Sequence, residues 1–106
     1  MTVDGVSTNS VTVRIVGSSD AFAKTAYLVF ERLRSVFGAQ VCGKYYNASE
    51  PSLTEFPPAL ALIRLGAAPL PLVFVDNDLV VIGGKISVPD LRQRLTALGL
   101  KPGVNR

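Results

Sequence analysis

Few residues of this chain belong to the types that carry out covalent chemistry. Cys42 is the only cysteine, and histidine is absent from all 106 positions. A serine nucleophile needs a base to accept its proton, so Ser18 and Ser19 lack the usual partner, and only a desolvated Lys24 or Lys85 could replace it. Serines at the entry of a helix more commonly cap that helix. We therefore predict that one of these serines caps the helix and that the chain has no catalytic residue.

The thiol of Cys42 is the remaining candidate for covalent or redox chemistry. A single cysteine cannot form an internal disulfide bond. Cys42 lies between Val41 and Gly43 in a predicted strand, which favours a buried and inert thiol. A regulatory or intermolecular thiol is the alternative, because an exposed thiolate reacts with the disulfide of a partner.

Two segments could hold an ion through polar atoms. The helix entry Gly17-Ser18-Ser19 offers backbone N–H groups to an anion, but the carboxylate of Asp20 opposes one. The run Asp76-Asn77-Asp78 offers three oxygen donors to a divalent cation, although such runs are more typical of hairpin turns. The absence of histidine also removes most zinc and copper sites. We predict no metal site and no cofactor.

The charge of the chain is modest and scattered. Eleven basic residues face 8 acidic ones, which gives a net charge of +3, and the basic residues form no run. Tryptophan is absent, and the other aromatic residues do not interleave with the basic ones, so we do not expect a nucleic-acid partner. No apolar run approaches the roughly 20 residues that cross a bilayer, and Met1 to Ser10 are too polar for a signal peptide. We expect a cytoplasmic protein without a membrane partner.

Hydrophobic periodicity predicts the elements that position these residues. Alternating or wholly apolar runs indicate strands, and apolar residues at intervals of three and four indicate helices. The predicted strands are Val11–Val16, Val41–Tyr46, Leu72–Val75 and Leu79–Ile82, and the predicted helices are Phe22–Phe37, Pro58–Leu65 and Val88–Leu98. We predict one domain over residues 10–100, with flexible tails at residues 1–9 and 101–106.

The order of these elements, β-α-β-α-β-β-α, predicts an α/β fold. Its β-α-β start requires a parallel strand pair with a right-handed crossover, and the last two strands form a hairpin. One mixed four-stranded sheet with helices on both faces satisfies both requirements.

One segment resembles the thioredoxin-like superfamily, in its minimal glutaredoxin-like form. In residues 70–91, Pro71 opens an apolar strand, a short turn and a return strand follow, and Gly83-Gly84 precede a terminal helix with Leu91. The resemblance covers roughly residues 11–98. The segment from Tyr45 to Leu98 is also similar to the ArsD-type arsenic metallochaperones and to the YuzD-type disulfide isomerase-like bacterial proteins.

The resemblance implies a cis peptide bond at Pro71 and a binding edge built from three turns. The residues that would meet there are Gly17, Ser18, Ser19, Asp20, Leu70, Pro71, Gly83 and Gly84. In the family this edge carries Cys-x-x-Cys or Cys-x-x-Ser, whereas this chain has Ser18-Ser19-Asp20-Ala21. Thiol–disulfide exchange needs a thiolate nucleophile, so we expect a redox-inactive protein that carries over neither the oxidoreductase activity nor the arsenic-carrying activity.

These features predict a non-catalytic module that binds a protein partner or a second copy of itself, forming a dimer. One alternative is a redox-linked protein that uses Cys42 or a partner thiol. Another is a sensor of a small ligand, glutathione or a peptide at the edge that contains Pro71. The backbone of Leu70 would bind the peptide there. In glutaredoxins a nearby acid binds the amino end of glutathione, whereas Asp90 of this chain comes late in the sequence for that role. One of Tyr45 and Tyr46 should be core, and the other should be exposed enough to anchor a partner. The outer face of the first helix, with Arg32 and Arg34, is the competing contact surface.

Overall fold

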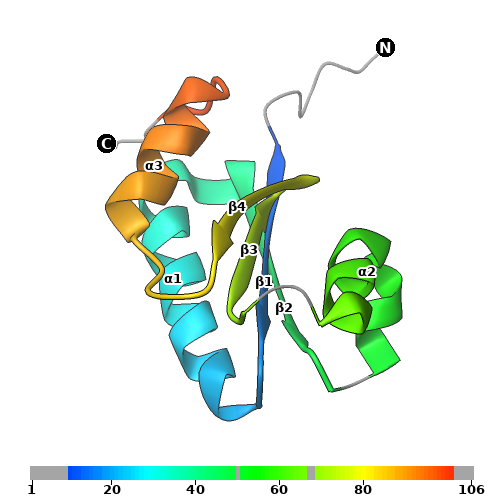
Figure 1. Ribbon diagram of the computed structural model, residues 1–106. Helices are drawn as coiled ribbons and strands as arrows, with labels where there is room; N and C mark the ends of the chain where they lie inside the picture. The colour runs from blue at the N-terminus through cyan, green and yellow to red at the C-terminus, as the bar shows by residue number, and fades with distance from the viewer. Residues whose placement is uncertain (1–9, 50, 67–68, 102–106) are drawn as a thin grey trace.

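The computed structural model describes residues 10–49, 51–66 and 69–101 (Figure 1). Of the predicted tails at residues 1–9 and 101–106, only Lys101 lies within this part. Its strands are β1 (Val11–Gly17), β2 (Val41–Asn47), β3 (Leu72–Val75) and β4 (Asp78–Ile82). Its α-helices are α1 (Ala21–Phe37), α2 (Pro57–Leu65) and α3 (Val88–Ala97), and two 3-10 helices are η2 (Gly38–Gln40) and η3 (Pro51–Glu55).

The fold is α/β, with one open and mixed four-stranded sheet. The strand order is β2-β1-β3-β4, in which β1 pairs parallel with β2 and antiparallel with β3, and β3 pairs antiparallel with β4. Helices α1 and α3 cover one face of the sheet, and α2 covers the other (Figure 1). The predicted order of elements and the two-faced arrangement are both confirmed.

The end of strand β1 is buried on both faces because it lies inside the sheet and between the helices. Val13 and Ile15 point to the α1 and α3 side, and Val16 points to the α2 side, each with 0% of its surface exposed. Alternate residues of a strand point to opposite faces, so the β-branched run of β1 supplies both cores.

The long helix α1 follows the predicted apolar spacing. Its buried residues lie on one stripe, and the helix ends before Gly38, which has a φ of 62°. The ring of Phe30 packs so closely on β2 that a side chain at Gly43 would overlap it. The glycine in this strand is therefore required by packing.

The second core cluster lies under α2 and η3. The ring of Phe56 stacks on Tyr46 and meets the edge of Phe74 at a centroid distance of 4.8 Å. The guanidinium of Arg14 lies 4.4 Å from the centroid of Phe56, a cation–π contact. Helix α2 begins at Pro57, one residue before the predicted start, and Gly66 ends it in the left-handed conformation. These contacts fix α2 over the half of the sheet that contains Tyr46.

The β3–β4 hairpin turns at Asp76 and Asn77, whereas the predicted turn also included Asp78, which is the first residue of β4. The carboxylate of Asp76 accepts a hydrogen bond of 3.0 Å from the backbone N–H of Thr12. This aspartate therefore joins the hairpin to β1. The Leu70–Pro71 peptide bond before β3 is cis, the conformation that the resemblance implies. Within the described residues, no helix is long and apolar enough to span a membrane.

Candidate binding site at one end of the sheet

Three turns meet at the end of the sheet where β1 finishes. Val16 pairs with Leu72, and Leu72 pairs with Ile82, so the end of β1, the start of β3 and the end of β4 lie side by side. The segments beyond them are Gly17–Asp20, Leu70–Pro71 and Gly83–Gly84, which we call the Pro71 edge. The structure thus brings the predicted site segments together.

A hydrogen bond from Gly83 joins the Gly83–Gly84 turn to the Leu70–Pro71 turn. The N–H of Gly83 donates this bond of 2.7 Å to the carbonyl oxygen of Pro71. The φ of Gly83 is 71°, and a Cβ atom there would lie 2.9 Å from Cγ of Pro69. Glycine is therefore needed at this position both for its backbone conformation and for the close approach of Pro69. The carbonyl oxygen of Pro71 therefore already accepts one hydrogen bond from within the fold.

The loop between β1 and α1 is held by side chains of β2. Nδ2 of Asn47 donates to Oδ1 of Asp20 at 3.0 Å, and the hydroxyl of Tyr45 donates to the carbonyl of Ser19. Oδ1 of Asn47 accepts from the backbone N–H of Ser49 at 3.0 Å and from its hydroxyl at 2.7 Å. Asn47 is only 8% exposed. The loop is thus a preformed turn whose acid already has a partner.

Sequence reasoning missed the role of Asn47. The signal available was a polar residue at the end of a strand, directly after two tyrosines. Its two partners are 27 and two residues away in the sequence, and only the parallel pairing of β1 with β2 brings the distant one close.

The prediction that Ser18 or Ser19 caps α1 is wrong. The N-cap is Asp20, which has helical φ and ψ of −65° and −24°, and α1 has no side-chain cap hydrogen bond. An N-cap side chain normally reaches the helix from an extended backbone, whereas the carboxylate of Asp20 is turned to Asn47. Both serines are exposed. The chain has no histidine, and Lys24 and Lys85 are both exposed, so neither lysine is desolvated as a replacement base would have to be.

Leu70 presents unpaired backbone groups at the Pro71 edge. Its side chain is half-buried and packs against the α2 core cluster. Among the described residues, no hydrogen bond uses its backbone N–H or C=O. These groups are therefore free to pair with another chain.

The two tyrosines divide as the alternation of β2 predicts. Tyr46 is buried in the α2 core cluster, and Tyr45 is half-buried on the other face of the strand. The ring of Tyr45 stacks with Phe22, with their centroids 6.3 Å apart. Tyr45 therefore braces the Ser19 turn and leaves only part of its ring to a partner.

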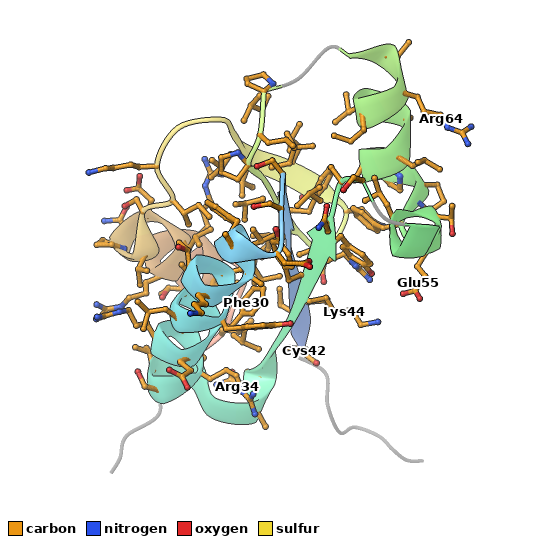
Figure 2. All side chains as sticks on the ribbon, turned by 90° about the horizontal axis from the view of Figure 1, so that it is seen from below. Phe30, Arg34, Cys42, Lys44, Glu55 and Arg64 are labelled. Carbon is orange, nitrogen blue, oxygen red and sulfur yellow. The ribbon has the colours of Figure 1, made fainter. Side chains whose placement is uncertain are left out.

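The prediction of a buried Cys42 is wrong, because this residue is exposed. Strand β2 is the outer strand of the sheet, and Cys42 lies on the face that α2 covers. Helix α2 and η3 reach over Tyr46, but they leave the beginning of β2 open. Figure 2 shows Cys42 near the start of the strand, with Lys44 and Glu55 farther along this side.

Of the remaining candidate ligands, the carboxylate of Asp76 is bonded to the backbone N–H of Thr12. Asp90 lies in the first turn of α3, where its backbone N–H donates to Oγ of Ser87. The described part of the chain contains no group of three or more acidic, cysteine or histidine residues that could hold a metal. The Pro71 edge therefore offers a partner the free backbone groups of Leu70 and the surface formed by three turns.

No protein-family model matches the chain, and no curated protein matches it either.

The bonds of Asn47 predict a contrast between neighbouring substitutions. Asn47→Ala removes the bonds to Asp20 and Ser49 and should lower the free energy of unfolding by about 1–3 kcal/mol. Ser18→Ala and Ser19→Ala should change it by less than about 0.5 kcal/mol, since neither hydroxyl caps α1. Urea unfolding followed by circular dichroism measures all three. A loss at either serine as large as that at Asn47 would show that a serine cap forms after all.

Proposed function

We propose that this protein is a non-catalytic thioredoxin-like domain that binds an extended segment of a partner protein at the Pro71 edge. The element order, the strand order β2-β1-β3-β4 and the place of Pro71 before β3 support this fold. In open α/β sheets, ligands bind beyond strand ends such as the end of β1.

The observation that carries this proposal is the unpaired backbone of Leu70. An extended peptide gains affinity by pairing its own N–H and C=O groups with free groups of this kind. Among the neighbouring glycines, Gly84 faces open space, with no atom within 4 Å of where a Cβ would lie, so no side chain holds another chain away there. The side chain of Leu70 adds apolar contact beside the free backbone.

The chemistry of the loop argues for binding without catalysis. Ser18 and Ser19 occupy the place where the family keeps its thiols, and the acid beside them is bonded to Asn47. Cys42 pairs with Thr12, five residues before Gly17, so it lies about 16 Å away along the sheet. It cannot take the place of the missing thiol pair at this edge.

The first test compares two leucine-to-arginine substitutions of equal charge. A random dodecapeptide library displayed on phage is selected on the immobilised protein, and the enriched peptides are measured by biolayer interferometry. Leu70→Arg should weaken their binding at least tenfold, because a long cation replaces the contact surface beside the free backbone. Leu98→Arg, an exposed position at the far end of α3, should change it less than twofold.

Equal binding to both variants would contradict the proposal, as would a selection without enriched peptides. If Arg32→Glu with Arg34→Glu abolishes binding while Leu70→Arg leaves it intact, the contact surface is the outer face of α1. Concentration-dependent association of the protein itself, measured by light scattering and abolished by Leu70→Arg, would identify a second copy as the partner.

The exposure of Cys42 favours a second candidate, a redox-linked protein. A Cys42 thiolate can attack the disulfide of oxidised glutathione, forming a mixed disulfide and releasing one glutathione thiolate. The chain has no second cysteine to resolve this bond, so the reaction stops after one exchange and gives no turnover.

Incubation with oxidised glutathione tests this candidate. The native protein should gain one glutathione by mass spectrometry, at a rate near that of the urea-unfolded chain, because the thiol is already exposed. The Cys42→Ser variant is the control and should gain none. A native rate that is a hundredfold or more below the unfolded one would show a protected thiol and would remove the candidate.

A further inference from the structure

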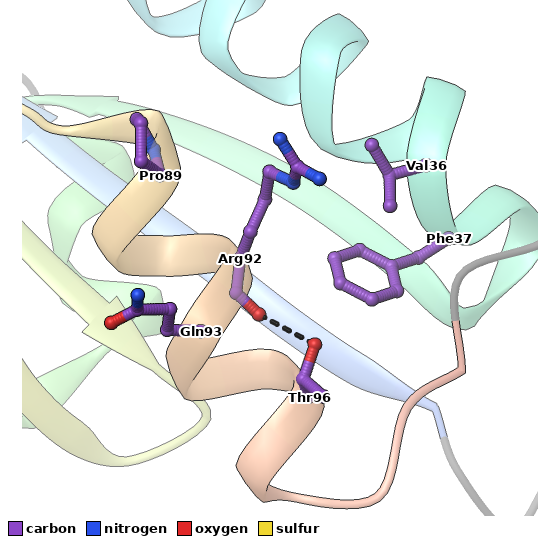
Figure 3. Close-up of a pocket in the computed structure, with 6 residues that line it drawn as sticks. All are labelled: Val36, Phe37, Pro89, Arg92, Gln93 and Thr96. Carbon is purple, nitrogen blue, oxygen red and sulfur yellow. Dashed lines mark hydrogen bonds between the residues drawn. The ribbon is translucent and has the colours of Figure 1, made fainter.

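A groove between α1 and α3 lies away from the Pro71 edge. Its hollow has a volume of about 400 Å³ (Figure 3). The residues that line it are Val36, Phe37, Pro89, Arg92, Gln93 and Thr96. Val36 and Phe37 end α1, whereas the Pro71 edge adjoins its first turn, so the two surfaces are about 24 Å apart along the helix.

The groove combines an apolar floor with a cationic rim. Phe37 forms part of the floor and is only 2% exposed, and Val36 beside it is half-buried. Arg92 extends from α3 into the space toward α1 (Figure 3). The hydroxyl of Thr96 donates to the Arg92 carbonyl at 2.9 Å and is thereby tied to its own helix. Arg92 is the only charged residue of this lining, so its charge dominates the groove.

A row of side chains on α1 leads to the groove, and its last member, Val36, lines it. Leu28, Arg32 and Val36 follow at intervals of four, which places them on one line along the helix. Leu28 is 49% exposed, although it is a large apolar residue. The row therefore alternates apolar, cationic and apolar groups and ends in the hollow.

Neither arginine of this surface has an ion pair within the part of the chain that the structure describes. The positions three and four residues from each are uncharged, so neither helix supplies an acid at pairing distance. For Arg32 these are Leu28, Val29, Ser35 and Val36, and for Arg92 they are Val88, Pro89, Leu95 and Thr96. Both side chains are exposed and are therefore available to the carboxylates of a partner.

We propose that the α1–α3 groove, with the Leu28–Arg32–Val36 row, binds an acidic amphipathic helix of a partner protein. Side chains at four-residue intervals form ridges that pack into the groove of another helix. Apolar residues of the partner would contact Leu28, Val36 and the floor, while its carboxylates would meet Arg32 and Arg92. This surface acts independently of the Pro71 edge.

Two other occupants fit less well. A second copy of this chain would bring Arg32 and Arg92 against the same cations in a two-fold interface, and each copy carries a net charge of +3. An anionic membrane would attract the arginines, but a lipid surface is entered by protruding apolar side chains. The floor residue Phe37 instead lies at the bottom of a hollow.

Selection from a helical library tests the proposal. A phage library of 18-residue amphipathic helices, randomised on one face, is selected on the full-length protein after depletion on the Arg92→Glu variant. The enriched helices should carry acidic residues beside leucines at four-residue intervals. Fluorescence anisotropy should show at least tenfold weaker binding to Arg92→Glu and to Arg32→Glu, whose thermal melts are checked against the parent protein.

Matched variants separate this site from the others. Arg34→Glu makes the same charge change on α1, but Arg34 lies in a separate hollow with Glu31 and Ser35, so it should alter binding less than twofold. Leu70→Arg should also leave it unchanged. A helix in which lysine replaces each acid should bind Arg92→Glu better than the parent protein, which a loss of folding could not produce.

Four results would overturn the proposal. These are a selection without enriched helices, equal binding to Arg92→Glu and the parent, equal binding of the acidic and basic helices, and binding to phosphatidylserine vesicles but not to acidic helices.

Discussion

The burial of the end of β1 on both of its faces is the constraint on which the rest of the structure depends. This strand pairs with β2 on one side and β3 on the other, and both of its faces are covered by helices. Its parallel pairing with β2 requires the chain to cross the sheet through α1. The same pairing carries Asn47 to the first turn of α1. The position of every turn at the Pro71 edge therefore follows from where β1 ends.

Much of the fold could be predicted because its signals are local. The apolar stripe of α1, the glycine that ends it and the apolar run of β3 each lie within one segment. Ser87 is the N-cap of α3, and its hydroxyl accepts from the N–H of Asp90, as its place before Val88 and Pro89 suggests. The meeting of three turns at one edge could also be anticipated, because antiparallel neighbours must bring those ends together.

The errors at the candidate site have nonlocal causes. Whether Cys42 is buried depends on how much of β2 helix α2 covers. The residues of β2 alone do not indicate the extent of this cover. The two serines have the sequence position of helix caps, but the N-cap is Asp20, whose carboxylate accepts a hydrogen bond from Asn47. The α1–α3 groove exists only once two helices lie side by side. In each case the deciding partner is distant in the sequence, so composition and periodicity could not reveal it.

Amide hydrogen exchange at Leu70 is the most direct measure of the central claim, that free backbone at the Pro71 edge receives an extended peptide. In the free protein, nuclear magnetic resonance should show fast exchange for the Leu70 N–H and slow exchange for the Gly83 N–H, which is bonded to Pro71. A saturating peptide from the dodecapeptide selection should slow Leu70 at least tenfold and leave Gly83 unchanged. A Leu70 amide that is already protected in the free protein, or that the peptide does not slow, would contradict the account.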